Sequence, residues 1–329
     1  MSNQSTSDKL EPSRNPAGSG TIRKTRVDNA GIIMLTIFSA MLGLNQALVK
    51  LVNAGFSPIF QAGLRSVCAF FIVLTFALIF KKKLSIKDGS LLPGLTIGLL
   101  FTAEFFLLFT ALDYTTVSRV SLFFYTQPFW VALGAHFFIA GEQLNRNRIM
   151  GLLIAIAGIT LCLFNGLASA SAETLKGDVM CLIAAIFWAM IALMPRTTRI
   201  SVSTPEMQLL YQLAVSGIIL TSLAPLLEDP IRNLTPIILA VFSFQVVFIV
   251  SIGFIFWFWA ISVYPTSDMA SFSLLSPLFG VFFGWVIFND QITIEFTVAL
   301  FMVTIGIVLS NKKVPSANLC NTDQRSRSL

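Results

Sequence analysis

Long apolar runs separated by short polar segments occupy this chain from about residue 30 to residue 311. Ten of the runs are long enough to cross a hydrocarbon layer roughly 30 Å thick. Because the backbone must satisfy its own hydrogen bonds in lipid, continuous runs of this length predict helices and not a barrel of short alternating strands. We therefore predict an all-α integral membrane protein with ten transmembrane helices, at 30–53, 58–80, 90–112, 116–139, 146–165, 177–195, 205–227, 235–261, 265–288 and 294–311.

The composition also indicates a chain whose solvent is lipid. Of the 329 residues, 55% are apolar, 12% are charged and 31 are phenylalanine, and the mean hydropathy is +0.81. A soluble core of this size cannot bury so much apolar surface, which excludes a cytosolic enzyme, a secreted disulfide scaffold and a disordered chain. The polar ends, 1–28 and 312–329, are predicted to be disordered tails.

Ten helices would divide the tails and connections between the two sides of the membrane. Lysine and arginine are distributed unevenly between these sides. Seventeen of the 22 lie in the tails and in the connections 81–87, 146–148 and 196–199, which share one side. Since positive charge is retained inside, both termini are predicted to be cytoplasmic, in a plasma or bacterial inner membrane. The net charge of +6 is thus a topology signal and predicts no nucleic-acid partner. The opposite connections carry only Lys50, Arg119, Lys176 and Arg232.

The two halves of the chain, 30–165 and 177–311, are internal repeats of five predicted helices each. ALDYTTVSRVSLFFYTQP at 111–128 matches AISVYPTSDMASFSLLSP at 260–277 without a gap. An odd number of helices in each repeat inverts the second copy relative to the first, which is typical of secondary transporters. Two further correspondences support the repeat: Pro58, Gln61 and Arg65 match Pro205, Gln208 and Gln212 at a constant shift of 147, and Glu142 to Gly158 matches Asp290 to Gly306 with the same spacing of 16.

Several short motifs carry a resemblance to a known family. They are Asn45 to Lys50 with Pro58 and Arg65, ALDYTTVS at 111–118, GE at 141–142, and GDVMCLIAAIFWA at 177–189. In order and spacing they resemble the EamA-type branch of the drug/metabolite transporter superfamily, over about residues 30 to 311. One departure is Asp290, where the second repeat of that family usually has glutamate. The resemblance implies secondary transport of a small metabolite, such as an amino acid or a related compound, commonly as export.

Two ionisable residues inside predicted helices are candidate site residues, because buried charge is costly in a membrane. Glu104 lies about 12 Å and Arg65 about 10 Å below the same predicted surface, at 1.5 Å per helical residue. The pair admits three interpretations: a structural salt bridge, which we favour, contact with the substrate, or proton coupling. In the second repeat, Gly253 occupies the position equivalent to Glu104, and Gln212 the position equivalent to Arg65. Both charges are therefore additions to a symmetric scaffold.

Other polar and aromatic residues of the spans are expected to face the interior of the bundle, since lipid offers them no partners. Gln61 and Arg65 share one helical face, and so do Gln208 and Gln212. For each residue an interhelical contact is the alternative to binding a ligand. The remaining candidate substrate-binding or coupling residues are Asn45, Tyr125 and Trp188.

The sequence favours a secondary transporter that works by alternating access. It contains no G-x-x-x-x-G-K-[ST] motif, so the predicted driving force is a proton gradient, exchange or the gradient of the substrate. No Cys and His spacing predicts a metal or cofactor site. The expected partners are a small-molecule substrate, the lipid bilayer and protons, with a homodimer as an alternative use of the Gly94–Gly98 and Gly280–Gly284 pairs.

Three alternatives to this function remain open from the sequence. The first is an exchanger or uptake carrier for a charged, nucleotide-like metabolite. The second is a membrane-embedded enzyme, which is less favoured because His136 is the single histidine and no catalytic constellation accompanies it. The third is a passive channel, which has no need for two inverted halves.

Overall fold

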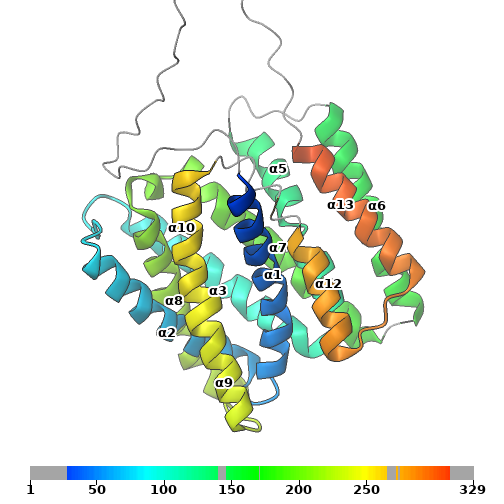
Figure 1. Cartoon of the computed structure of the whole chain (residues 1–329), viewed down its shortest axis with the longest axis horizontal. Coiled ribbons are helices and arrows are strands. Elements are labelled where there is room, and N and C mark those ends of the chain that lie inside the picture. Colours follow the sequence, from blue (N-terminus) through cyan, green and yellow to red (C-terminus); the bar gives the residue numbers. More distant parts are fainter. Residues whose placement is uncertain (1–27, 140–145, 170, 265–271, 273–274, 312–329) are drawn as a thin grey trace, which may run out of the picture.

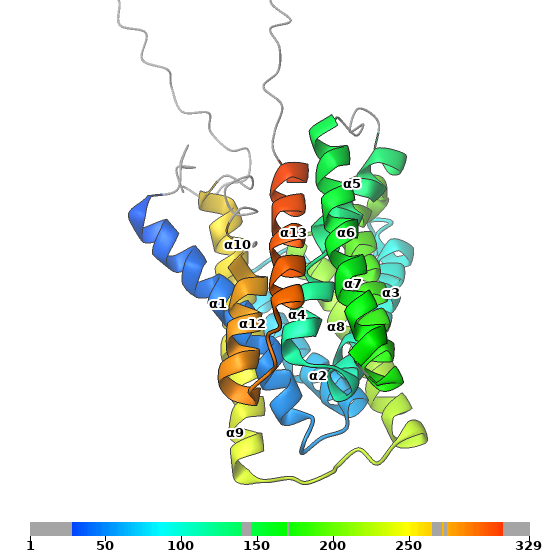
Figure 2. The same cartoon turned by 90° about the vertical axis from the view of Figure 1, so that its right-hand side faces the viewer.

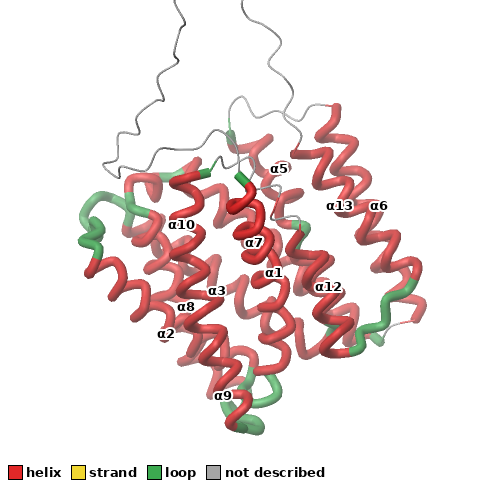
Figure 3. Tube along the Cα trace, viewed as in Figure 1, coloured by secondary structure: helices red, strands yellow, loops and turns green. Residues whose placement is uncertain are grey.

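The computed structural model describes residues 28–139, 146–169, 171–264, 272 and 275–311, whose regular structure is helical (Figures 1 and 3). Within these ranges, β-structure is limited to one isolated antiparallel bridge between Phe56 and Ile231. The predicted all-α architecture is therefore confirmed. The predicted tails lie outside the described residues, apart from Asp28.

The first half of the chain forms helices that begin where the sequence provides caps. Ser57 precedes α2 and its Oγ accepts a hydrogen bond from the Phe60 backbone N–H at 3.3 Å. Such a side chain satisfies one of the free N–H groups of the first turn. The helices of this half are α1 (Asn29–Val52), α2 (Pro58–Ile79), α3 (Leu91–Tyr114), α4 (Val117–Phe124), α5 (Gln127–Phe138) and α6 (Arg146–Ser169).

The second half follows the same plan. Thr204 caps α8 in the same way, with its Oγ1 accepting from the Met207 N–H at 3.3 Å. Its helices are α7 (Ala172–Thr197), η1 (Arg199–Val202), α8 (Pro205–Leu227), α9 (Pro236–Phe244), the π-helix η2 (Gln245–Ile252), α10 (Gly253–Val263), α12 (Leu275–Phe288) and α13 (Ile294–Asn311).

In the part of the chain that the structure describes, five helices are long and apolar enough to cross a membrane by themselves. They contain 22 to 26 residues, and each includes an apolar stretch of 18 residues with no more than two charged side chains. The other apolar helical stretches of the described residues are shorter, and include Pro236–Ile252 and Leu275–Phe288. The five long helices are α1, α2, α3, α7 and α8.

The predicted span 116–139 is not one continuous helix, which corrects the sequence prediction. The chain leaves α4 at Tyr125 and enters α5 at Gln127, with Pro128 in its first turn. Proline has no N–H and therefore cannot donate to the carbonyl of Phe124 one turn earlier. The break instead uses a hydrogen bond from the Thr126 Oγ1 to the Phe123 carbonyl at 2.6 Å.

Helices at corresponding positions of the two halves run antiparallel. The end of α2 meets the start of α8 through an ion pair of 2.9 Å between Lys82 Nζ and Glu206 Oε1. The start of α2 meets the end of α8, where the Ser57 N–H donates to the Pro230 carbonyl at 2.9 Å. In Figure 2, α1 starts at the end of the bundle where α13 ends, whereas α7 runs back toward that end. Each half has five spans when α4 and α5 are counted as one broken span, and α9, η2 and α10 as another, with the short η1 left out. The chain is therefore built from two inverted five-helix repeats.

Glycines at equivalent positions bring the last helices of the repeats together. A Cβ added to Gly158 of α6 would lie 2.9 Å from the Ala299 carbonyl oxygen of α13. A Cβ on Gly306 of α13 would lie 2.7 Å from the Ala155 nitrogen of α6. Because both sites exclude any side chain, the pair packs backbone against backbone in the manner of small-residue membrane interfaces.

The two G-x-x-x-G pairs also pack within the monomer. Gly94 and Gly98 of α3 face Tyr211 and Val215 of α8, while Gly280 of α12 faces α4. Figure 1 shows α3 beside α8, and α12 on the other side of α1. These contacts account for the spacing of the glycines without a dimer interface.

Candidate substrate-binding site

Arg65 is held inside the bundle by the aromatic face of α3. Its side chain is 7% exposed. The guanidinium carbon lies 5.5 Å from the ring centre of Phe109 and 5.6 Å from that of Phe105. Phe101, Phe105 and Phe109 follow one another at four-residue intervals, with ring centres 4.0 and 5.1 Å apart. The ring faces attract the cation and fix its position between α2 and α3.

Glu104 lies beside this aromatic row and is 2% exposed. Arg65 lies on the neighbouring helix α2 and is the group of opposite charge. No ion pair of 4.0 Å or less joins them, however, among the contacts of the described residues. The direct salt bridge considered from the sequence is therefore not formed in this conformation.

Both charged groups retain hydrogen-bonding atoms without partners in the described part of the chain. These atoms are Nε and Nη1 of Arg65 and Oε2 of Glu104. A buried polar atom without a partner costs about 1–3 kcal/mol, and more when it is charged. Two buried donors and one buried acceptor without partners are suited to a ligand that carries both an acceptor group and a donor group.

Gln61 lies one turn before Arg65 on α2 and is fully buried. Its Nε2 donates to Oε1 of Gln245 at 3.5 Å, the outer limit for such a bond. The Gln61 Oε1 and the Gln245 Nε2 have no other partner within the described ranges. The two amides thus present one free acceptor and one free donor near the arginine.

Gln245 is a candidate site residue that the sequence analysis missed. It is fully buried and opens the π-helix η2, in which the Ser251 Oγ donates to the Val246 carbonyl at 2.8 Å. π-Helical turns are rare and are frequent at functional sites. The sequence signal that could have found it is a single amide side chain inside the apolar run 235–261. The same criterion selected Gln61.

Asn45 and its neighbour Gln46 extend the polar interior onto α1. Asn45 is half-buried and Gln46 is 3% exposed. The side-chain oxygens of both residues have no hydrogen-bond partner in the ranges that the structure describes. α1 therefore contributes acceptors to the polar interior, and none of the contacts within the described ranges joins them to Arg65 or Glu104.

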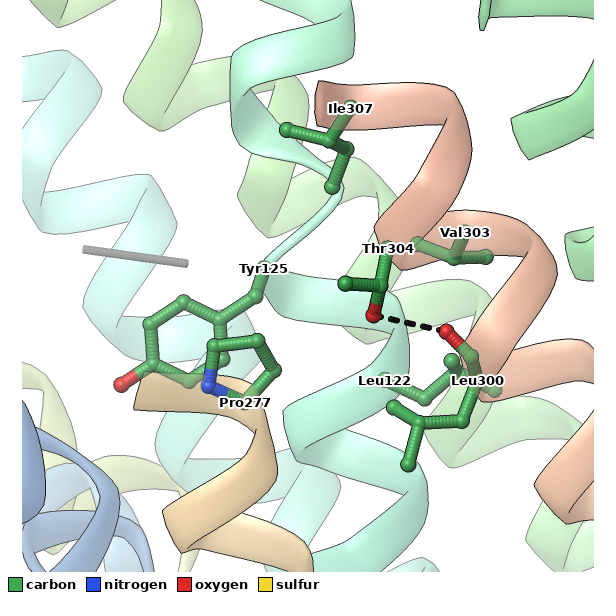
Figure 4. Close-up of a pocket in the computed structure, with 7 residues that line it drawn as sticks. All are labelled: Leu122, Tyr125, Pro277, Leu300, Val303, Thr304 and Ile307. Atoms are coloured by element: carbon green, nitrogen blue, oxygen red, sulfur yellow. Dashed lines mark hydrogen bonds between the residues drawn. The ribbon is translucent and has the colours of Figure 1, made fainter. Parts of the chain in front are cut away.

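Tyr125 belongs to a different place, at the break between α4 and α5. Together with Pro277 of α12 and residues of α13 it lines a small apolar pocket, shown in Figure 4. Its cavity volume is about 10 Å³, room for about one water molecule and far below the roughly 300–1,000 Å³ of ordinary ligand sites. The lining residues are Leu122, Tyr125, Pro277, Leu300, Val303, Thr304 and Ile307.

The other predicted residues make local or apolar contacts. The Gln208 Nε2 donates to the carbonyls of Ile200 and Ser203 at 3.1 and 3.2 Å, which ties η1 to α8. The Gln212 Nε2 donates to the Gln208 carbonyl at 3.3 Å. Trp188 of α7 packs against the largest apolar cluster. The described residues contain no group of three or more potential metal ligands.

Comparison with known proteins identifies related transporters. The sequence model of the EamA-like transporter family matches residues 29–164 and 175–312. The chain is 23% identical to the "Uncharacterized transporter YoaV" of Bacillus subtilis (strain 168) over 283 residues, which are 84% of this chain and 96% of the relative. It is 27% identical to the "Probable amino-acid metabolite efflux pump" of Escherichia coli (strain K12) over 287 residues, which are 83% and 92% of the two chains.

The fold resembles a solved one as well. A crystal structure described only as that of a protein superposes with a TM-score of 0.60 and 17% sequence identity. The superposition covers 86% of this chain and 98% of the other. At this identity the likeness concerns the fold alone.

Proposed function

The chain belongs to the EamA-like transporter family, and on this premise we propose that it exports an amino acid or a related zwitterionic metabolite by alternating access. The observation that carries the proposal is the buried pair of opposite charges, Arg65 and Glu104, which have free hydrogen-bonding atoms and no direct ion pair among the described contacts. The similarity to a relative named as a probable amino-acid metabolite efflux pump supports the proposed substrate class and direction.

A zwitterion would complement both charges at once. Its carboxylate would accept from Nε and Nη1 of Arg65, while its ammonium group would donate to Oε2 of Glu104. The free Gln61 acceptor and Gln245 donor would lie beside the arginine end of such a ligand. Each buried charge would then face an opposite charge, which offsets the cost of removing the ligand from water.

The inverted repeats support alternating access as the mechanism. Two similar bundles that pack antiparallel can rock about a central site and open it first to one side and then to the other. The chain has no phosphate-binding G-x-x-x-x-G-K-[ST] motif, so the proposed driving force is a gradient or an exchange. Both termini are proposed to be cytoplasmic, in a plasma or bacterial inner membrane, from the distribution of lysine and arginine.

Thermal unfolding of the purified full-length protein in lipid nanodiscs tests the substrate class. A ligand that binds the folded state raises the unfolding temperature. We expect at least one of the common α-amino acids to do so, while its methyl ester, which lacks the carboxylate, and its N-acetyl derivative, which lacks the ammonium, do not. Arg65→Gln and Glu104→Gln should each remove the shift. Arg199→Gln and Glu173→Gln, at exposed positions, are the matched controls and should keep it.

Two results would contradict the proposal. Equal stabilisation by the ester and the N-acetyl derivative would show that the site does not recognise a zwitterion. Stabilisation by anions alone, with Glu104→Gln unaffected, would instead favour the carrier of a charged metabolite.

A further inference from the structure

The start of α7 is bound to the α3–α4 connection at the end of the bundle opposite the start of α1 (Figure 2). Thr115, the residue that ends α3, donates its Oγ1 hydrogen to Oδ1 of Asp178 at 2.9 Å. Arg119 of α4 places its Nε 3.0 Å from each carboxylate oxygen, and its Nη2 forms an ion pair with Oδ2. Asp178 is fully buried. We name Thr115, Arg119 and Asp178 the distal latch.

The distal latch is closely packed and also involves α1. A Cβ on Gly177 would lie 2.9 Å from the Thr115 Cβ, so α7 approaches the end of α3 at backbone distance. The Lys50 Nζ donates to the Thr115 carbonyl at 2.7 Å. Thr115 and Arg119 of the first repeat thus bind a carboxylate that belongs to the second repeat, and Lys50 of α1 bonds to Thr115.

A second contact of the same kind lies at the other end of the bundle, where α1 starts. Tyr264, which ends α10, donates its hydroxyl hydrogen to Oδ1 of Asp28 at 2.9 Å. Asp28 is the N-cap of α1 and also accepts from the Gly31 N–H at 3.1 Å. Tyr264 is 2% exposed and packs in an apolar cluster with Leu35 and Ala260. We name Asp28 and Tyr264 the terminal latch.

The two latches correspond under exchange of the repeats. Thr115 and Tyr264 are 149 positions apart, and so are the matched alanines Ala111 and Ala260. The Thr115 N–H donates to the Ala111 carbonyl, and the Tyr264 N–H donates to the Ala260 carbonyl. The two aspartates are 150 positions apart, close to the repeat shifts of 147 and 149 but equal to neither, so they lie near equivalent positions and not at them. In each latch, the residue that ends the third span of one repeat holds an aspartate near the start of the first span of the other repeat.

We propose that the two latches are the gates of the transport cycle, one at each membrane face, and that both are closed in this structure. The inference rests on the proposed alternating access. Each latch joins one repeat to the other, so the repeats cannot separate at either end without breaking the latch of that end. The latch at the other end can persist meanwhile, which keeps the site closed to the second side.

Cysteine accessibility in oriented membrane vesicles tests this assignment. The reporter is Asn45→Cys in the full-length chain with its four native cysteines changed to serine, and the probe is a membrane-impermeant maleimide applied from either face. Thr115→Val and Tyr264→Phe remove one latch hydroxyl each and retain nearly the same shape. We expect Thr115→Val to raise labelling from the distal face and Tyr264→Phe to raise it from the terminal face, by about three- to tenfold for one ordinary hydrogen bond.

Each variant serves as the control for the other, and Thr96→Val, on the exposed surface of α3, should change neither rate. Asp178→Asn provides a second distal variant and should act in the same direction as Thr115→Val. A rise on the wrong face, equal rises on both faces or no rise in either latch variant would overturn the assignment. Because labelling requires no substrate, this result is independent of whether the site binds a zwitterion.

Discussion

Arg65 of α2 and Glu104 of α3 are both buried on neighbouring helices, and no direct ion pair joins them among the described contacts. The guanidinium rests on the rings of Phe105 and Phe109. The separation leaves hydrogen-bonding atoms of both groups free. With this geometry, the three interpretations of the pair predict different experimental results.

Neutralising one member of the pair should destabilise the protein more than neutralising both. Glu104→Gln leaves Arg65 buried without an opposing charge, and we expect a loss of about 1–3 kcal/mol in the free energy of unfolding. Arg65→Gln in the same chain should recover part of that loss. Denaturant unfolding of the two single variants and the double variant in detergent measures the coupling, and strictly additive effects would show that the charges do not interact.

Proton coupling gives a separate signature in Glu104→Gln, because glutamine has a similar shape and does not titrate. In proteoliposomes, a coupling role predicts loss of uptake driven by a pH gradient while counterflow exchange of the same substrate persists. A role in substrate contact predicts loss of both. If the variant folds, transports and responds to pH as the parent does, Glu104 has neither role.

The membrane orientation predicts which positions react from outside the cell. In a chain with Cys320→Ser, an impermeant thiol reagent applied to intact cells should not label Lys82→Cys or Ser326→Cys, because both are predicted to be cytoplasmic. Asn233→Cys, in the exposed loop after α8, should be labelled. Labelling of Lys82→Cys together with protection of Asn233→Cys would reverse the orientation.

The fold should be sensitive to side chains at the contact between α6 and α13. Gly306→Val would place atoms where a Cβ already lies 2.7 Å from the Ala155 nitrogen, so the two helices must separate. We expect a loss of about 1–3 kcal/mol, as for overpacked cores, measured by unfolding in detergent. Ile305→Val, at an exposed position of the same helix, should cost much less, and equal losses would contradict the close packing.

Gln245 should matter for ligand binding more than for stability. Gln245→Leu removes the weak 3.5 Å hydrogen bond to Gln61 and a free donor, and keeps a similar volume. We expect the ligand-induced thermal shift to fall by the equivalent of a several-fold weaker affinity, since one hydrogen bond contributes about 0.5–1.5 kcal/mol. The unfolding temperature without ligand should change little. The reverse pattern would make Gln245 a structural residue.

The sequence by itself determined the all-α membrane architecture and the two five-helix repeats. The length of a span follows from bilayer thickness, and its helical form follows from the need to satisfy backbone hydrogen bonds internally. A run of apolar residues in the local sequence is enough to meet both requirements. The matched spacings that end at Gly158 and Gly306 also marked positions that the structure uses for close packing. The break at Pro128 had a local cause, although a prediction of spans by hydropathy did not register it.

Only the tertiary structure decided which polar side chains meet. Gln61 and Gln208 occupy equivalent positions of the repeats, yet Gln61 bonds to Gln245 of the neighbouring η2 while Gln208 bonds to the carbonyls of Ile200 and Ser203. Such pairing depends on how each helix is rotated and how closely its neighbours approach, which small residues on several distant helices set together. For the same reason, the separation of Arg65 from Glu104 and the approach of Thr115 to Asp178 are properties of the packed bundle and not of any one span.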